Sequence, residues 1–398
     1  MRQQFQLISR KRIFQFITLC IILSLNNCTN TSNDSPMEAK ILSELIIGTY
    51  TKKEGHVDGK AAGISQMEVL ENGQLQNPKL IADNIINPSY LSLSQDNQFL
   101  YAASETGPDV DSVAYIYAYG RKEDGNWEML NRQSSFSFAP CYISVHPNGK
   151  VVAAANYVGG IVALYPLNED GSLQEASTVI QLEGSGPHPR QDSSHPHSVV
   201  FSPDGKYCYI PDLGANKVWI YRYEESNHSL QPTTPGFVAL PANAGPRHII
   251  MHPNAKWIYV INELSSSVAF FQLEEDGYNL DLIQDVTTLP SDIEIYNTTA
   301  DIHLTSDGKN LYASNRGHNS IAHFSINPNN GQLNQGGHYS TQGNTPRNFA
   351  IAPNDQYLYV ANQDSDSIVG FKIAEDGTLD QFQVVETPTP VCLKFSRQ

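Results

Sequence analysis

Basic residues are scarce in this sequence. Its 398 residues include 25 Lys and Arg against 41 Asp and Glu, which gives a formal net charge of −16 at pH 7. Four of the basic residues lie within residues 1–27, which contain no acidic residue, so the rest of the chain is still more acidic. Such a surface repels a phosphate backbone, and we therefore expect no nucleic-acid partner. A small anion can still be bound where a few arginines converge locally.

Several catalytic and metal-binding signatures are also absent. The sequence contains no CxxC pair, no HExxH motif and no GxSxG turn. We therefore expect neither a metal site nor covalent serine or cysteine catalysis, and we predict no cofactor. Beyond residue 28 the cysteines are an odd three, Cys141, Cys208 and Cys392, which do not form a disulfide framework. We interpret them as small buried apolar residues.

The N-terminus reads as a targeting segment. Residues 1–12 are basic, and residues 13–25 (IFQFITLCIILSL) form an apolar run too short to span a bilayer as a helix. Leu25 stands three residues before Cys28, which resembles a bacterial lipoprotein signal. We predict a signal peptide over 1–27, lipidation and membrane attachment at Cys28, and a polar linker over 28–43. The protein is then exported, as a periplasmic or membrane-anchored lipoprotein; plain secretion is the alternative.

One pattern of proline, turn and apolar residues recurs along the chain. It reads PCYISVHPNGKVVAAANY from Pro140, PHSVVFSPDGKYCYIPDL from Pro196 and PRNFAIAPNDQYLYVANQ from Pro346. The six copies begin at Pro88, Pro140, Pro196, Pro246, Thr299 and Pro346. A period near 50 residues is typical of propellers and other repeat arrays.

Each repeat translates into four antiparallel strands separated by Pro-, Asn-, Asp- and Gly-rich turns, without helical periodicity. At the C-terminus, PVCLKFS (390–396) matches a first strand, whereas ELIIGTY (44–50) near the N-terminus matches a second strand. The sequence therefore predicts an all-β fold, a single seven-bladed β-propeller over 44–396 with four-stranded blades. The C-terminal strand is expected to close the ring within the N-terminal blade, which removes open sheet edges.

A functional site is expected at one mouth of the central channel, where first strands begin and second strands end. Most repeats carry bland residues just after the first-strand proline or just after the second strand. Five departures occur in neighbouring repeats: His197, Arg247 and Arg347 in the first position, and Glu263 and Arg316 in the second. Three arginines beside a histidine and a glutamate indicate an anion site. The alternative is that these charges merely pair with one another and with acidic loops.

The loop before His197, GSGPHPRQDSSHPHS (184–198), is also unusual. Its polar residues include Arg190, Gln191 and His195, which we predict to bind substrate together with Arg347. Its histidines could in principle hold a metal, but a zinc site needs three or four ligands on fixed elements, and no matched His or Cys pair is present.

Five motifs give the chain a family resemblance: GSGP..RQ...HPHS (184–198), GPRH (245–248), NEL (262–264), SNRGHNSI (314–321) and PRNFAI (346–351). With these motifs residues 44–396 resemble the propeller-type lactonases, the family of bacterial 6-phosphogluconolactonases and fungal muconate-lactonizing enzymes. The resemblance implies an active-site set of one histidine, two arginines and one glutamate. In this sequence these are His197, Arg247, Glu263 and Arg316.

The resemblance implies hydrolysis of a sugar lactone, with an anionic lactone favoured, to the aldonic acid by metal-independent acid/base catalysis. Either His197 or Glu263 could be the base. The export signal is unexpected for a cytoplasmic sugar-phosphate enzyme and leaves open whether the lactone is phosphorylated. A muconate-type lactonizing cycloisomerase and a non-catalytic binding propeller at the cell surface remain as alternatives.

Overall fold

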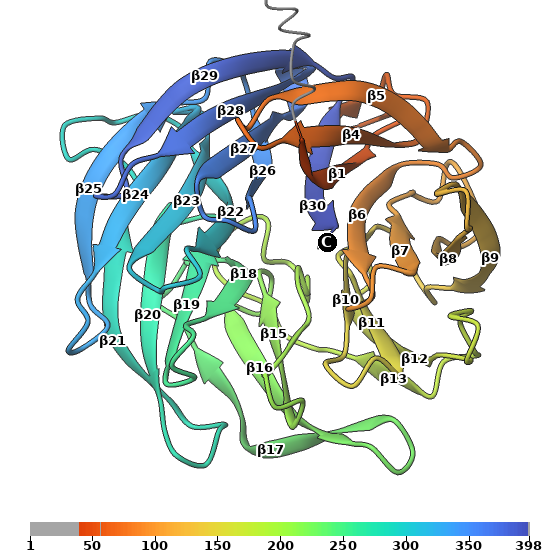
Figure 1. Ribbon diagram of the computed structural model, residues 1–398. Coiled ribbons are helices and arrows are strands. Elements are labelled where there is room, and N and C mark those ends of the chain that lie inside the picture. The colour runs from red at the N-terminus through yellow and green to blue at the C-terminus, as the bar shows by residue number, and fades with distance from the viewer. Residues whose placement is uncertain (1–39, 56, 397–398) are drawn as a thin grey trace, which may run out of the picture. The chain divides into compact units, whose positions relative to one another are not determined.

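The computed structural model describes residues 40–55 and 57–396 and contains seven four-stranded antiparallel sheets arranged as a ring (Figure 1). The predicted seven-bladed propeller is thereby confirmed. The predicted signal peptide, Cys28 and nearly all of the predicted linker lie outside the described residues. The first described strand, β1 (Ile41–Thr49), begins three residues before the expected start of the repeats. Within the described chain, no helix is long and apolar enough to cross a membrane.

The blades follow one another along the chain, and their strands run in order from the channel to the outer rim. Blade 1 is β30 (Pro390–Ser396), β1, β4 (Ile64–Leu70) and β5 (Leu75–Ala82). Blade 2 is β6 (Pro88–Leu93), β7 (Phe99–Ser104), β8 (Tyr115–Arg121) and β9 (Trp127–Ser134). Blade 3 is β10 (Pro140–Val145), β11 (Val151–Asn156), β12 (Ile161–Pro166) and β13 (Thr178–Gln181). Blade 4 is β14 (Val200–Phe201), β15 (Tyr207–Asp212), β16 (Lys217–Glu224) and β17 (Ser229–Ala239).

The remaining three blades have the same strand order. Blade 5 is β18 (Pro246–Met251), β19 (Trp257–Asn262), β20 (Ser267–Leu273) and β21 (Leu280–Thr287). Blade 6 is β22 (Thr298–Leu304), β23 (Asn310–Arg316), β24 (Ser320–Ile326) and β25 (Leu333–Ser340). Blade 7 is β26 (Pro346–Ile351), β27 (Tyr357–Asn362), β28 (Ser367–Ile373) and β29 (Leu379–Glu386). A short hairpin, β2 (Lys53–Glu54) and β3 (Val57–Asp58), and one 3-10 turn (Gln363–Ser365) complete the described elements.

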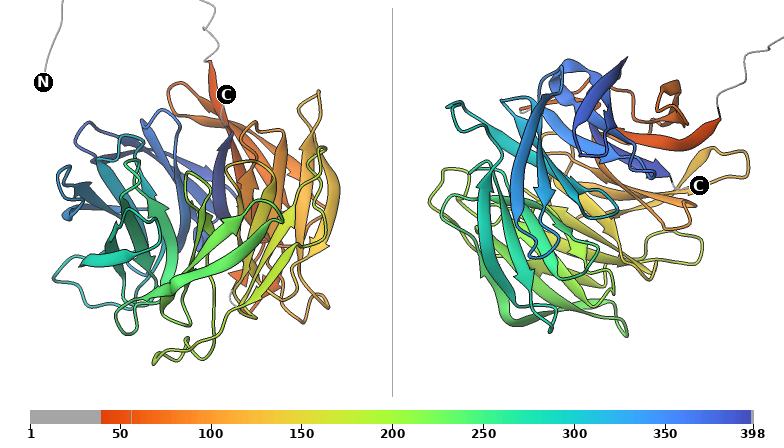
Figure 2. Two further views of the ribbon diagram at one scale, coloured as in Figure 1. Left: turned by 90° about the horizontal axis from the view of Figure 1, so that it is seen from below. Right: turned by 60° about the vertical axis from the view of Figure 1, so that its left-hand side comes forward.

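The ring closes as the sequence predicts, because the C-terminal strand β30 pairs with β1 in blade 1. The pairing runs antiparallel from Glu44 opposite Ser396 to Thr49 opposite Pro390. The first strands surround the channel and the fourth strands form the outer rim, with connecting loops on both faces of the ring (Figures 1 and 2). The two ends of the described chain therefore share one sheet, and no sheet edge is left open at the closure.

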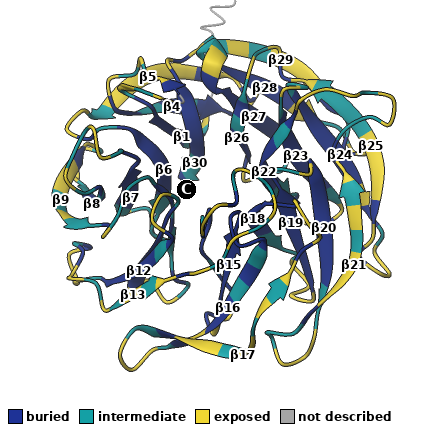
Figure 3. Cartoon of the chain, turned by 180° about the vertical axis from the view of Figure 1, so that it is seen from behind, coloured by how far each residue is buried: buried dark blue, intermediate teal, exposed yellow. Residues whose placement is uncertain are grey.

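The core lies between neighbouring blades. Second strands such as β11, β19 and β27 are buried along their whole length, whereas the outer strands alternate between exposed and partly buried residues (Figure 3). Five blades carry a tyrosine at the third position of the second strand, and its hydroxyl donates to a glycine carbonyl in the turn of the next blade. These contacts are Tyr101 to Gly171, Tyr209 to Gly277, Tyr259 to Gly331, Tyr312 to Gly377 and Tyr359 to Gly73, at 2.5–3.1 Å.

Blade 4 departs from the regular repeat. The expected first strand from Pro196 is reduced to β14, and Pro196 itself makes only an isolated bridge to Asp212. The Asp212 carboxylate instead accepts hydrogen bonds from Ser194 Oγ at 2.5 Å and from the His195 backbone at 2.7 Å. These contacts add to the backbone hydrogen bonds from His197 to Pro211 and from Leu213 to His195, and together they fix the loop that precedes His197.

Candidate active site

A cavity of 490 Å³ lies at the mouth of the channel where the first strands begin. Its lining comes from several blades: Glu105, Ala139, Cys141, Tyr157, Val158, Arg190, His197, Glu263, Tyr296, Thr298, Arg316, Thr345, Arg347, Gln363 and Asp364. A narrower space lined by Arg247 and His248 shares Glu105, Cys141 and Arg347 with this cavity. The predicted set of His197, Arg247, Glu263 and Arg316 is therefore brought together at one opening.

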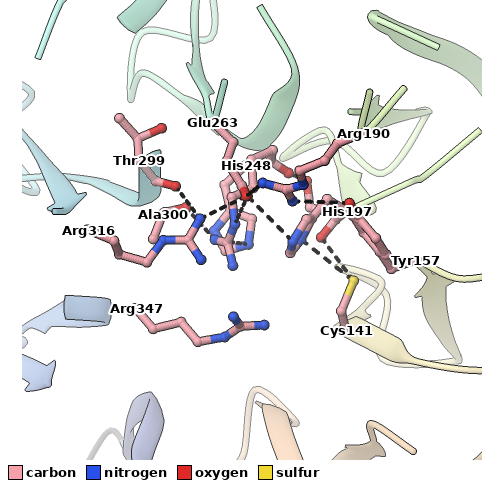
Figure 4. Close-up of polar contacts among 12 residues, drawn as sticks. Cys141, Tyr157, Arg190, His197, His248, Glu263, Thr299, Ala300, Arg316 and Arg347 are labelled. Carbon is pink, nitrogen blue, oxygen red and sulfur yellow. Dashed lines mark hydrogen bonds and ion pairs between the residues drawn. The ribbon is translucent and has the colours of Figure 1, made fainter. Parts of the chain in front are cut away.

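The Glu263 carboxylate is the hub of this cavity (Figure 4). Its Oε1 accepts Arg190 Nη1 at 2.7 Å and Arg316 Nη2 at 3.0 Å. Its Oε2 lies 2.9 Å from Arg247 Nε as an ion pair without hydrogen-bond alignment, and 3.9 Å from His197 Nε2. The pairing among the charged residues that was the alternative to an anion site thus exists, and it gathers three arginines on one carboxylate that is only 2% exposed.

Buried backbone contacts place the charged residues that follow the second strands. The Glu263 N–H donates to the Gly245 carbonyl at 2.7 Å. Gly245 has φ +65, and a Cβ there would lie 2.5 Å from Leu264, so this turn requires glycine. Asn315 is fully buried before Arg316 and donates its amide to a loop carbonyl at 2.9 Å. The strand ends that present Glu263 and Arg316 are thereby fixed.

Two arginines are anchored from below the cavity. Arg247 Nη1 donates to the Ala300 carbonyl and lies 3.1 Å from His248 Nε2. Arg316 Nη2 donates to the Thr299 carbonyl at 2.7 Å as well as pairing with the carboxylate hub. Arg316 Nε is a buried donor for which the described residues supply no hydrogen-bond partner. Because Nε itself is buried, a ligand in the cavity that Arg316 lines would meet other atoms of its guanidinium.

The electrostatics keep the hub ionised. Burial alone would raise the pKa of Glu263, but Arg316, Arg190 and Arg247 together hold it well below its ordinary value. Burial lowers the pKa of Arg316 to about 10, which leaves that guanidinium protonated at neutral pH. Burial opposes the charge on Arg190, but Glu263 and Tyr157 raise its pKa overall. Glu263 is therefore a carboxylate and a weak base.

His197 has the opposite character. Burial, with Arg247 as the next largest cause, lowers its pKa well below the ordinary histidine value, so the imidazole is neutral at pH 7. Its Nδ1 lies 3.6 Å from Cys141 Sγ, and its backbone N–H donates to the Pro211 carbonyl at 2.9 Å. Its ring contacts Tyr157 edge to face at 5.3 Å. A neutral, well-packed imidazole at a cavity wall can accept a proton.

Arg347 is bound less tightly than the other arginines. Its Nη2 lies 3.5 Å from Glu105 Oε1, and its guanidinium lies 5.5 Å from the centre of the Tyr50 ring. Burial disfavours its charge, but Tyr50, Glu105 and Glu263 raise its pKa overall. The side chain extends into the space opposite Glu263 (Figure 4). It can accordingly contact an anionic group of a ligand.

The loop over 184–198 contributes one residue to the cavity besides His197. Arg190 pairs with Glu263 and donates from Nη2 to the Tyr157 hydroxyl at 3.1 Å. Gln191 is fully buried and donates to the Leu213 carbonyl at 2.8 Å. His195 stacks on Tyr157 with its Nδ1 2.8 Å from the Tyr157 carbonyl. The structure does not bring Gln191 or His195 to the cavity wall, because their polar atoms are used to hold the loop.

Sequence reasoning missed the wall residues that come from loops between blades. Tyr296 and Thr298 precede or begin β22, Thr345 precedes β26, and Asp364 follows β27. Tyr296 is 84% exposed at the mouth. Thr298, Thr345 and Asp364 lie directly beside repeat positions, but threonine and aspartate are ordinary residues in turns, so nothing in the sequence marked them as wall residues. Only the exposed aromatic character of Tyr296 sets it apart from an ordinary loop residue.

The donor set of the cavity is cationic. Within residues 40–55 and 57–396, no group of three or more His, Cys, Asp or Glu is arranged to hold a metal ion. Cys141, Cys208 and Cys392 are free and buried. Burial raises the pKa of the Cys141 thiol far above its ordinary value, so it stays protonated beside His197. Arg190, Arg316 and Arg347 supply the charged donors of the cavity, and Glu105, Glu263 and Asp364 line it with them.

The chain matches known proteins over nearly all of its described length. Residues 44–395 match the family described as Lactonase, 7-bladed beta-propeller. A 6-phosphogluconolactonase from Bacillus subtilis is 35% identical over 361 residues, 88% of this chain and 98% of the relative. One from Formosa agariphila is 35% identical over 73% of this chain and 82% of its own. The structure of a periplasmic gluconolactonase from Pseudomonas aeruginosa superposes with a TM-score of 0.83 at 34% identity, covering 89% and 98% of the two chains.

Proposed function

The chain belongs to the seven-bladed β-propeller lactonase family, and from that premise we propose that it hydrolyses a sugar lactone to the corresponding aldonic acid. The observation that carries the proposal is the joint placement of a neutral, buried His197 and an ionised Glu263 in one cavity with Arg190 and Arg316, while Arg247 pairs with Glu263 from the adjoining narrower space. The cavity of 490 Å³ is within the range of small-molecule sites, about 300–1,000 Å³.

His197 is the base in this mechanism, and Glu263 is not. A general base must be unprotonated at the working pH and free to take a proton. Both groups are unprotonated, but Glu263 is engaged by three arginines, whereas no hydrogen bond within the described residues uses His197 Nε2. The 3.9 Å between His197 Nε2 and Glu263 Oε2 is too long for a direct hydrogen bond. A water molecule in the cavity can donate to the neutral His197 Nε2, which places the water oxygen for attack on the lactone carbonyl.

The reaction follows from these positions. Water oxygen bonds to the lactone carbonyl carbon while one of its protons passes to His197 Nε2. The carbonyl oxygen becomes an oxyanion, stabilised by the Arg316 guanidinium, which lines the cavity. The bond between the carbonyl carbon and the ring oxygen then breaks. The imidazolium returns its proton to that oxygen, which leaves as a hydroxyl group, and the new carboxylic acid releases a proton to solvent.

Glu263 has a positioning and balancing role in this mechanism. It holds Arg190, Arg247 and Arg316 at fixed places and offsets part of their repulsion. Arg347, which is less tightly paired, is the residue we assign to an anionic substituent of the substrate, either carboxylate or phosphate. No step of this acid/base scheme requires a metal.

Export of the protein is part of the proposal. The basic and apolar pattern of residues 1–25 supports it, as does the similarity to a periplasmic gluconolactonase. Fatty-acid labelling tests the lipid anchor: label incorporated by the wild type and absent from Cys28→Ala supports it. Unlabelled wild-type protein recovered in the soluble periplasmic or extracellular fraction contradicts the anchor, and recovery in the cytosol contradicts export itself.

Acid release in a pH-stat tests the activity most simply. Purified protein is given glucono-δ-lactone and its 6-phosphate, with the uncatalysed rate subtracted and with EDTA added in a parallel series. We expect proton release above background that EDTA leaves unchanged and that His197→Ala reduces by about 10²–10⁴-fold. Binding of the lactone without acid release indicates the binding propeller instead. Loss of the absorbance of cis,cis-muconate indicates the cycloisomerase.

A further inference from the structure

A network of buried polar side chains, formed by Arg247, His248 and Asp301, lies directly beneath the cavity. His248 Nδ1 lies 2.7 Å from Asp301 Oδ1, and His248 Nε2 lies 3.1 Å from Arg247 Nη1. Arg247 in turn pairs with Glu263 through Nε at 2.9 Å. His248 is 4% exposed and Asp301 is 2% exposed, and neither lines the cavity where the lactone is placed. Any influence that they have on the reaction passes through neighbouring residues.

The hydrogen-bond donors and acceptors in this network can be assigned in only one way. A guanidinium donates hydrogen bonds and cannot accept them, so Arg247 Nη1 is the donor and His248 Nε2 is the acceptor. The remaining ring proton must then be on His248 Nδ1, from which it is donated to Asp301. Asp301 thus selects the His248 tautomer whose Nε2 can accept a hydrogen bond from Arg247. Carboxylates often fix the tautomer of a histidine ligand or base in this way.

Asp301 is itself held by donors on every side. Its Oδ1 also accepts the Ile302 N–H at 3.0 Å, and its Oδ2 accepts His303 Nε2 at 3.0 Å and the Asn348 amide. Burial alone would raise the pKa of Asp301, but His303 and His248 hold it well below its ordinary value. The carboxylate is therefore ionised and fixed in place. His303 is 28% exposed and lines a separate cavity of 850 Å³. The network of polar side chains therefore extends from the candidate site to a second cavity.

Arg247 depends on this support for its orientation. Its contact with Glu263 lacks hydrogen-bond alignment, so its aligned partners are His248 and the Ala300 carbonyl, both at Nη1. No hydrogen bond from Nη2 occurs within the described residues. The angle of the guanidinium plane, and with it the direction of Nη2, is thus set from below. Misplacement of a reacting or stabilising group by about 1 Å can cost about 10²-fold in rate.

We propose that His248 and Asp301 are positioning residues that fix the Arg247 guanidinium for the lactone reaction. The inference rests on the proposed lactonase function. It adds two buried residues that were not among the predicted site residues, although His248 belongs to the GPRH motif. They touch neither substrate nor reacting atoms and act by tautomer selection and orientation.

Paired substitutions of His248 separate orientation from packing. Asn places an amide N–H near the position of Nδ1 and keeps the bond to Asp301, but offers no acceptor to Arg247. Gln places its oxygen near the position of Nε2 and keeps that acceptor. We expect His248→Asn to lower kcat by about 10²-fold with KM little changed, and His248→Gln to stay within about tenfold of wild type. His323→Gln, a buried histidine of blade 6 bonded to Asn310, is the matched control and should keep wild-type kcat.

Asp301→Leu tests the tautomer. Leucine has a similar shape but no acceptor, so the Nδ1–H of His248 loses its partner and the Nε2–H form, which turns a donor towards Arg247, becomes populated. We expect a kcat loss of about 10²-fold in protein that circular dichroism shows to be folded. Nitrogen-15 NMR of labelled histidine should show the Nδ1–H form of His248 in the wild type and a gain of the Nε2–H form in Asp301→Leu.

The outcomes separate this proposal from the proposed function. If the wild type opens no lactone, the lactonase function fails while the NMR assignment still decides the tautomer. An Nε2–H form in the wild type overturns the proposal. Wild-type kcat in folded His248→Asn also overturns it, as does an equal loss in the Asn and Gln variants, which would point to the packing of the ring against Tyr90 and Tyr142.

Discussion

The seams between blades and the mouth of the channel use the same repeat in opposite ways. At the seams, five second strands carry the same tyrosine, and each makes the same bond to a glycine carbonyl of the next blade. At the mouth, the positions where second strands end hold different residues, among them Glu105, Tyr157, Glu263 and Arg316. Repetition therefore indicates a structural role, and departure from it marks a candidate functional site.

The two regions also differ in their electrostatics. The seam tyrosines are neutral, and burial raises the pKa of Tyr259, which keeps its phenol protonated as a donor. The mouth contains buried charged side chains, which would be destabilising without partners because of desolvation and mutual repulsion. Burying charge at this cost indicates a functional role for the residues of the mouth. The seam tyrosines, in contrast, are explained by their contribution to folding. Four substitutions or measurements test this division.

Removal of the closing strand should have the largest effect. Truncation after Thr389 deletes β30 and leaves one edge of β1 unpaired. Because the ring then has an open sheet edge, we expect no cooperative unfolding transition and rapid proteolysis, measured by circular dichroism and limited trypsin digestion. Deletion of residues 397–398 alone is the control and should retain the transition. A truncated protein as stable as the wild type would show that closure does not hold the ring together.

Glu263→Gln should affect both stability and activity. It therefore tests whether a residue of the mouth also contributes to the stability of the fold. The amide leaves Arg190, Arg247 and Arg316 without their shared counter-charge. Breaking a buried pair in this way costs about 3–5 kcal/mol, and we expect a lower free energy of unfolding together with loss of most lactone opening. Urea unfolding and acid release measure the two effects. Unchanged values for both would remove Glu263 from its assigned role as hub.

The pH dependence sharpens the assignment of the base. The pKa of His197 in the folded protein is lowered, chiefly by burial and then by Arg247, so the imidazole is neutral above that pKa. Activity is therefore complete at neutral pH and is lost only as the pH falls through a value below about 6.5, the ordinary histidine pKa. Initial rates at saturating and limiting lactone should show this acid limb. A midpoint at or above 6.5, or the same limb in His197→Gln, contradicts the assignment.

A seam substitution should have the smallest effect and should leave chemistry untouched. Tyr359→Phe removes the hydroxyl that donates to the Gly73 carbonyl between blades 7 and 1. A single hydrogen bond contributes about 1 kcal/mol, so the unfolding midpoint should fall slightly while kcat and KM stay at wild-type values. Ala153 occupies the equivalent position in blade 3, so that blade already lacks the contact. A large loss of activity in Tyr359→Phe would show that seam and mouth are coupled.

Most of the fold could be predicted because the prolines, turns and alternating apolar residues recur in register. The exception is blade 4, where strand pairing near Pro196 is reduced to an isolated bridge and the Ser194 side chain and His195 backbone donate to the Asp212 carboxylate. Alternation within a sequence indicates a strand, but it does not reveal a competing carboxylate farther along the chain. That competition is tertiary and could only be found in the structure.

The candidate site could be predicted where it follows the repeat and not where it depends on loops. His197, Glu263 and Arg316 occupy repeat positions, so their convergence followed from the ring. Tyr296 lies in a loop between blades, which has no register. Gln191 shared a motif with Arg190, yet only Arg190 reaches the cavity, because the direction of each side chain is set by the fold of the loop.

A crystal structure with the aldonic acid product bound is the decisive experiment for the proposed active site. We expect the product in the 490 Å³ cavity, with its carboxylate on the Arg316 guanidinium and within hydrogen-bond distance of His197 Nε2. A product bound elsewhere, or held in the cavity with its carboxylate turned away from His197 and Arg316, would contradict the proposed mechanism.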